Sequence, residues 1–334
     1  MQELLGKFNK EIDEYITRNR IYTADDVKLE EDMADLVIGS YRQLSRRNAR
    51  AYFHKLRYTS IESSIRLAIE FLSIYYNEEY KNEFIDALNR KFVFRTYDGS
   101  KSSYYDIDHD KIYIYLRCDI FDAITMIHEF MHYINTNRRI RTPLSMYFTE
   151  AISFHSEYSF EEFIVKYYPH RASELKAWQY NRDDCAYYNA IMFKILTGLL
   201  KVKQMGKKLN IHFLNEVINE IPGVSIDDIK VVLDAIKVEL TDKDTNTFQK
   251  LYDYEMGYVI AGVFGRYLYL EQQGNKKIGV EINSLVIEKK NTYRQLFNYL
   301  GIDFILSSLD DPSLLFAPGE TKRLGTICNS KIVV

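Results

Sequence analysis

Two histidines four residues apart, with a glutamate directly after the first, form the run His128-Glu129-Phe130-Met131-His132. On a helix, residues four apart lie one turn above each other, so both imidazoles can bind one zinc ion. Glu129 lies about 100° further around such a helix, where its carboxylate can take a proton from a water molecule beside the ion. We therefore predict that His128 and His132 are zinc ligands and that Glu129 is the catalytic base.

A catalytic zinc ion needs a third protein ligand and an open position for water. The metzincin arrangement is excluded, because it needs Gly and His at positions where this chain has Asn135 and Arg138. Glu150 lies 18 residues after His132, beyond Pro143, and a second antiparallel helix would bring it beside the two histidines. Glu150 is the predicted third ligand of one zinc ion per chain.

Ser153 and Glu157 lie on the same helical stripe as Glu150. Glu157 would be about 10.5 Å further along the helix axis, too far to share the ion, so we predict that it holds a ligand histidine from behind, with Ser153 in the same supporting stripe. A solvent-facing glutamate is the alternative interpretation of Glu157. His155 points away from this stripe and is predicted to be a packing or surface histidine.

The elements that must position these residues are mainly helical. Apolar residues recur at intervals of three and four over residues 1–91, which predicts three or four helices there. The runs FVFRTYDGS (92–100) and KIYIYLRCD (111–119) are rich in β-branched and aromatic residues and predict a β-hairpin. Helical spacing resumes after Asp119, a predicted N-cap, and continues nearly to the end of the chain.

Alternation in the second run would bury Ile112 and Ile114 and turn Tyr113 and Tyr115 toward a groove, where both could bind substrate. We expect an extended peptide to pair with residues 111–116. The predicted fold class is mainly α, a helical zincin-type metallopeptidase domain with a small β-hairpin or sheet before the active-site helix. The predicted segments are a helical 1–90, a catalytic core 91–309 and a tail 310–334.

Composition narrows the classes of partner and compartment. The 334-residue chain has a formal net charge of −3, so no strong overall positive charge favours nucleic acid or an anionic membrane. A locally basic stretch at 36–61 is predicted to be a solvated helix face. Three cysteines without paired spacing predict no disulfide framework, and no apolar run reaches the length of a membrane span or a signal peptide. We expect a cytoplasmic protein, or a secreted one without a classical signal.

The chain resembles the zinc metallopeptidases of the thimet oligopeptidase and oligoendopeptidase F family in the runs KIYIYLRCD-IFDAITMIHEFMHYIN and TEAISFHSE. In that family a strand precedes an H-E-F-x-H-type helix, and a second helix carries Glu, then Ser three and Glu seven residues later. The run NTYRQLFNYLGIDF is similar to the family's terminal helix. The chain departs from the family in having Met131 where a glycine is usual, which would narrow the approach to the metal, and in having no histidine within 213–334.

A tyrosine-rich run, LYDYEMGYVIAGVFGRYLYLEQQG, resembles the family helix that supplies hydroxyl groups to the substrate carbonyl. The resemblance implies that Tyr254 and Tyr258 stabilise the oxyanion and that Tyr252 contacts substrate. It also implies a shortened N-terminal half, and hence a reduced roof over the cleft formed by residues 1–90.

These observations predict a zinc-dependent endopeptidase acting on peptides or flexible protein segments. Two alternatives remain: a gluzincin aminopeptidase, although the Gly-x-Met-Glu-Asn strand of that branch is absent from residues 91–118, and a non-catalytic helical interaction protein with a structural zinc ion. The sequence gives no signal for an oligomeric state.

Overall fold

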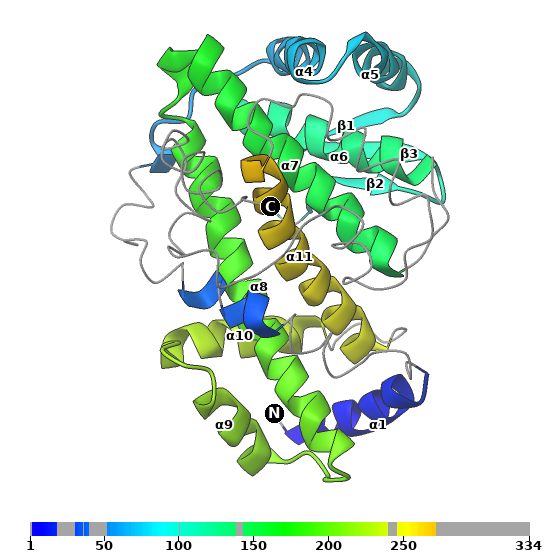
Figure 1. Ribbon diagram of the computed structural model, residues 1–334, viewed down its shortest axis with the longest axis vertical. Coiled ribbons are helices and arrows are strands. Elements are labelled where there is room, and N and C mark those ends of the chain that lie inside the picture. Colours follow the sequence, from blue (N-terminus) through cyan, green and yellow to red (C-terminus); the bar gives the residue numbers. More distant parts are fainter. Residues whose placement is uncertain are drawn as a thin grey trace, which may run out of the picture. The chain divides into compact units, whose positions relative to one another are not determined.

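The computed structural model describes residues 2–18, 31–35, 37–39, 52–99, 101–137, 143–239 and 246–271. They fall into two compact units, and each is described by itself (Figure 1). Unit 1 takes the described residues within Met1–Leu44 and Asp183–Ile260. Unit 2 takes those within Ser45–Arg182 and Ala261–Phe304.

Unit 2 contains a three-stranded mixed sheet that directly precedes the helix with the histidine pair. The strands are β1 (Phe92–Thr96), β2 (Tyr104–Asp106) and β3 (Lys111–Leu116), in the spatial order β1-β3-β2. β3 runs parallel to β1 and antiparallel to β2. The mainly helical fold with a small sheet at this place in the chain agrees with the sequence prediction.

Two details of the predicted strands are wrong. The runs 92–100 and 111–119 are not the arms of one hairpin, because β1 and β3 are parallel and the hairpin joins β2 to β3. Its turn is closed by Asp106, whose carboxylate accepts the backbone N–H groups of Asp108 and His109. Because β3 lies between two strands, the predicted pairing of a substrate with residues 111–116 is also wrong, and β2 is an edge strand instead.

One face of the sheet carries the packing against the helices. Ile112 and Ile114 are fully buried, as predicted. Phe92 lies opposite Ile112 in the register and contacts Phe84, whose ring in turn contacts Phe130 of α6, the helix with the histidine pair. Paired residues on neighbouring strands share a face of the sheet, whereas successive residues along one strand lie on opposite faces. Tyr113 and Tyr115 therefore lie on the face opposite Ile112 and Ile114.

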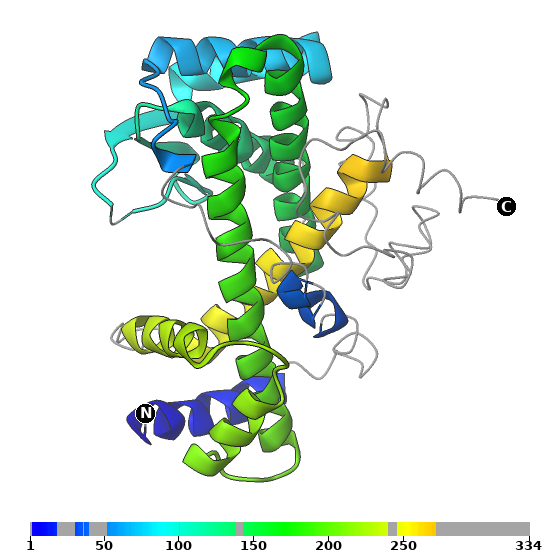
Figure 2. The same cartoon turned by 90° about the vertical axis from the view of Figure 1, so that its left-hand side faces the viewer.

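The helices of unit 2 pack against the sheet and against one another. They are α4 (Ile61–Tyr75), α5 (Glu78–Arg90), α6 (Ile120–Asn137), α7 (Pro143–Tyr167), the short 3₁₀ helix η2 (Pro169–Arg171), the first residues of α8 (Leu175–Gln204) and the last residues of α11 (Thr247–Glu271). α4 packs against α6 and α7 (Figures 1 and 2). Phe71 of α4 makes edge contacts with Phe160 and Phe163 of α7, so aromatic rings fill this part of the core.

The start of α6 is fixed by two aspartates. Asp119 accepts the backbone N–H of Phe121, which confirms the predicted N-cap. Asp122 accepts the N–H groups of Arg117 and Cys118 and so holds the turn between β3 and the helix, in which Cys118 has a positive φ of 60°. Burial raises the pKa of Asp122 to about 6. The histidine pair therefore lies on a helix anchored directly to the sheet.

Unit 1 is helical in its described part. It contains α1 (Gln2–Arg18), α9 (Ile211–Asn219), α10 (Ile226–Glu239), the later part of α8 and the first part of α11 (Thr247–Glu271). Phe8 and Tyr15 of α1 make edge contacts with Phe248 of α11, whose ring stacks on Tyr252. The 28 tyrosines of the chain thus include some that serve packing.

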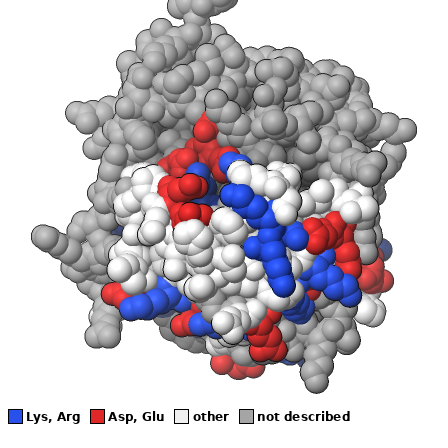
Figure 3. All heavy atoms as spheres, turned by 90° about the horizontal axis from the view of Figure 1, so that it is seen from below, with Lys and Arg blue, Asp and Glu red and all other residues white. Residues whose placement is uncertain are grey.

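The compact units do not follow the predicted segments. α1 belongs to unit 1, whereas α4 and α5 belong to unit 2 with the sheet, so the predicted segment 1–90 is divided. The predicted tail 310–334, the run 291–304 and half of the basic stretch 36–61 lie outside the described residues. On the face seen in Figure 3, Lys and Arg side chains lie among Asp and Glu side chains. No helix in the described ranges is long and apolar enough to span a membrane.

Candidate metal centre

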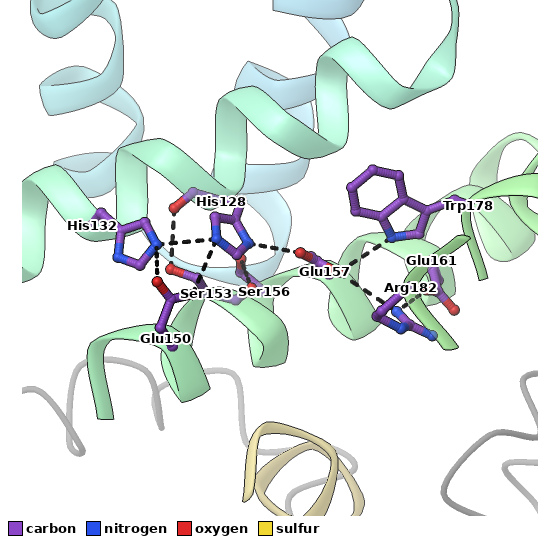
Figure 4. A network of polar contacts seen from close by, with 9 residues as sticks. All are labelled: His128, His132, Glu150, Ser153, Ser156, Glu157, Glu161, Trp178 and Arg182. Carbon is purple, nitrogen blue, oxygen red and sulfur yellow. Dashed lines mark hydrogen bonds and ion pairs between the residues drawn. The ribbon is translucent and has the colours of Figure 1, made fainter. Parts of the chain in front are cut away.

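α6 and α7 form an antiparallel pair that brings the predicted ligands together (Figure 4). α6 ends at Asn137 and α7 begins at Pro143, the residue that the sequence predicts to separate the two helices. The Ser153 hydroxyl of α7 donates a hydrogen bond to the His128 backbone oxygen at 3.1 Å, which fixes the register of the two helices. The remaining sides of α6 are packed, with Ile124, Ile127 and Met131 fully buried.

His128, His132 and Glu150 offer three ligand atoms that lie within 4.8 Å of one another. The two Nε2 atoms are 3.0 Å apart, and Glu150 places one carboxylate oxygen 3.2 Å from His132 and the other 3.5 Å from His128. Ligand atoms about 2.1 Å from a tetrahedral zinc ion are about 3.4 Å apart. The separations therefore fit a single small cation.

The polar atoms of this group also fit a cation. His128 directs Nδ1 at the Glu157 carboxylate, 2.7 Å away, so a neutral His128 is protonated at Nδ1 and presents an unprotonated Nε2 to Glu150 and His132. Glu150 Oε2 is buried and has no hydrogen-bond partner in the described part of the chain. When both histidines are neutral and their Nε2 atoms carry no proton, these two nitrogens and Glu150 Oε2 are three converging acceptors, and a metal ion would supply the positive charge that they need.

The charges in this group are strongly coupled. Burial lowers the pKa of His128, but Glu150 and Glu157 outweigh it and hold this pKa well above its usual value. Burial would raise the pKa of Glu150, yet His132 and His128 hold it well below its usual range. The carboxylate of Glu150 is thus kept ionised, which is the form that binds metal.

The three ligand side chains are not sealed from solvent. His128, His132 and Glu150 keep 12%, 14% and 21% of their side-chain surface exposed. A purely structural zinc site closes its fourth position with protein, whereas a catalytic one keeps it open to water. The partial exposure is consistent with the open arrangement.

Glu129 lies beside the ligands in a more buried position, at 7% exposure. Burial raises the pKa of its carboxyl above the usual value, and the charges of His128 and His132 oppose this shift. A raised pKa suits a carboxylate that must accept a proton and later release it. The structure thus places Glu129 where the helical spacing predicts it.

Glu129 also faces the edge of the sheet. The backbone N–H of Tyr105, the middle residue of β2, forms a hydrogen bond with its carboxylate that lowers the pKa. Tyr105 lies opposite Ile112, whose own N–H donates to Lys91 on the β1 side, so the Tyr105 N–H points away from β3. The side of β2 that faces away from β3 therefore runs past the predicted base.

Glu157 lies behind His128, as predicted, and is almost fully buried, so the solvent-facing alternative is wrong. Three residues around it were not predicted: Glu161, Trp178 and Arg182. Glu161 follows Glu157 at helical spacing, and this spacing could have revealed it. Trp178 and Arg182 come from α8, and no local sequence signal indicates that α8 approaches the metal centre.

Other predicted residues lie elsewhere. Tyr113 and Tyr115 are on the sheet face opposite Ile112 and Ile114, and Tyr113 stacks on Tyr104 at 5.0 Å. This placement argues against their contact with a substrate at Glu129, and their predicted role stays untested. Met131 is fully buried, so its side chain fills the core and does not border solvent.

The tyrosines of α11 that the resemblance implicates belong to unit 1. Tyr252 is buried in the aromatic core of that unit. Tyr254 is 55% exposed, and its ring lies 4.6 Å from that of Tyr258. Their roles in substrate binding and oxyanion stabilisation stay predictions.

His155 of α7 is a buried packing residue, consistent with the sequence prediction. Burial lowers its pKa to about 4, and its Nδ1 has no hydrogen-bond partner in the described ranges. The backbone beside it is also tightly packed, because a Cβ on Gly265 of α11 would lie 3.2 Å from the His155 nitrogen.

Comparisons with known proteins give no match to a family model, to a curated protein or to a solved structure. The resemblance to the thimet oligopeptidase and oligoendopeptidase F family therefore rests on the sequence motifs alone and stays a prediction.

Proposed function

We propose that this protein is a zinc-dependent peptidase that cleaves peptides or flexible protein segments. The observation that carries the proposal is the convergence of His128, His132 and Glu150, at separations that suit one ion, beside a buried Glu129. A zinc ion at this position would act as a Lewis acid toward a water molecule and a peptide carbonyl.

Glu129 supplies the proton transfers in the proposed reaction. Its carboxylate accepts a proton as water attacks the scissile carbonyl, and the resulting acid gives that proton to the departing amine. The raised pKa of Glu129 supports this role, because a more basic carboxylate is the better proton acceptor. The net result is one water added across one peptide bond.

The edge of β2 supports an extended substrate. A peptide that lies along an open strand edge is held through its backbone, with little demand on its side chains. The side of Tyr105 that faces away from β3 borders Glu129, so a peptide lying along this side would have its peptide bonds beside the base. This arrangement favours action within a chain, in keeping with an endopeptidase.

The test is hydrolysis of a quenched peptide library by the zinc-loaded protein and by Glu129→Gln. The substitution keeps size but removes the proton acceptor, so we expect kcat to fall about 10²- to 10⁴-fold, with one equivalent of zinc retained. Glu174→Gln is the matched control, since Glu174 is a fully buried glutamate paired with Arg171. It should keep kcat provided that it folds.

Two results would contradict the proposal. Wild-type turnover by Glu129→Gln would exclude the proposed base. A wild-type protein that holds one zinc ion but cleaves no library peptide would favour the alternative of a structural zinc ion.

A further inference from the structure

A buried polar network continues from His128 through α7 to a third helix, α8 (Figure 4). Glu157 directs Oε1 at His128 Nδ1, 2.7 Å away, and Oε2 at two donors on α8. These donors are the indole N–H of Trp178, at 3.2 Å, and the guanidinium of Arg182, at 3.7 Å. Glu157 is therefore held at both oxygens, by the ligand histidine and by α8.

Both α8 residues are themselves held in place. The Trp178 ring makes an edge contact at 5.0 Å with Phe121, in the first turn of α6. Arg182 forms a 2.5 Å ion pair with Glu161, and its guanidinium lies 4.1 Å over the ring of Tyr158. Side chains fixed by several contacts can fix the side chain that they touch.

The direction of the Glu157 carboxylate matters for the metal centre. A carboxylate behind a ligand histidine selects the tautomer and the ring orientation, and so decides which nitrogen faces the ion. In a buried site, a carboxylate without donors at its second oxygen could turn away from His128. The donors on α8 hold it in place.

We propose that Trp178 and Arg182 are positioning residues of the metal centre, which hold Glu157 so that His128 presents Nε2 to the ion. This inference rests on the proposed metal centre and extends it to α8. It also makes Trp178 a reporter of metal binding, because the chain contains one tryptophan and its N–H is linked through Glu157 to a ligand.

Trp178→Phe is the sharpest variant, because it keeps an aromatic ring against Phe121 and removes the N–H. Zinc affinity would be measured by competition with a chelating dye on metal-stripped full-length protein, without reference to activity. We expect Kd to rise about tenfold, the lower end of the effect of losing a partner behind a metal ligand. In the wild type, zinc should change tryptophan emission, with saturation at one equivalent.

Arg182→Gln is the second variant, and Arg171→Gln is its matched control. Arg171 pairs with buried Glu174 as Arg182 pairs with buried Glu161, but no described contact joins Arg171 to the metal ligands. We expect Kd to rise about 10- to 100-fold in Arg182→Gln and to stay unchanged in Arg171→Gln. Should Arg182→Gln fail to fold, Trp178→Phe still decides the question.

The outcomes separate this inference from the proposed function. If Trp178→Phe binds zinc with a Kd within twofold of the wild-type value, the positioning role is overturned and the proposed metal centre is not affected. An absence of zinc binding by the wild-type protein would overturn both. An equal loss of affinity in Arg171→Gln and Arg182→Gln would reduce the effect to general destabilisation and would also overturn the inference.

Discussion

Glu157 in unit 2 and Asp228 in unit 1 are both buried carboxylates, but they are surrounded by different donors. Glu157 meets nitrogen donors, from His128, Trp178 and Arg182. Asp228 meets hydroxyl groups, from two tyrosines of α8 and from Ser225, at 3.1, 3.2 and 2.6 Å. Its own N–H donates back to Ser225 at the start of α10.

The two sets of donors differ as expected for a carboxylate that stabilises a helix and for one that supports the candidate metal centre. The contacts of Asp228 described above join hydroxyl groups to the start of α10, as in a helix-capping arrangement. Glu157 passes its contact on to His128, whose other nitrogen faces His132 and Glu150. Both carboxylates are buried, so burial alone does not distinguish Asp228 from Glu157.

The largest expected effect concerns zinc binding, which should depend on the ligand group beside Glu157 and not on Asp228. His132→Ala removes one of three ligands and should weaken zinc binding by roughly 10³-fold or more. Asp228→Asn should leave zinc binding unchanged. Elemental analysis after dialysis measures both, and full zinc content in His132→Ala would contradict the assigned ligands.

A second effect concerns acid stability, and it follows from His155 of α7. Its pKa is lowered by burial from 6.5 to about 4, so below pH 6.5 the unfolded chain binds the proton more readily than the folded one. The stability that a neutral His155 contributes is present above pH 6.5 and is lost as the pH falls toward 4, by about 3 kcal/mol.

His155→Leu should remove this loss. Urea unfolding at several values between pH 4 and 7 would give a flatter pH dependence of the free energy of unfolding than in the wild type. Exposed His212 on α9 provides the matched control, and His212→Leu should keep the wild-type slope. An unchanged slope in His155→Leu would show that other groups carry the acid sensitivity.

The smallest effect belongs to the Asp228 cluster. Asp228→Asn keeps the side-chain size but removes the charge that the three hydroxyl groups and the N-terminus of α10 stabilise. We expect a loss of about 1–2 kcal/mol in the free energy of unfolding, measured by thermal or urea unfolding of the metal-stripped protein. If Asp228→Asn lost more free energy of zinc binding than free energy of unfolding, the proposed difference between Asp228 and Glu157 would be contradicted.

Most of the correct predictions came from the spacing of residues that are close together in the sequence. The ligand group depends on residues four apart on one helix and on a proline that separates two helices, and both are local signals. The topology of the strands depends on pairing between distant residues, so β1 and β3 could not be recognised as parallel neighbours. Trp178 and Arg182 were missed for the same reason, since only tertiary packing brings α8 to Glu157.

The three-residue edge strand β2 has a consequence for self-association. An open strand edge invites pairing with any other chain, and long flat edges are sites of aggregation. β2 has three residues, and Asp106 at its end brings a negative charge. Such an edge is too short for a long ladder with a second copy of the protein, whereas a short peptide segment needs no long ladder.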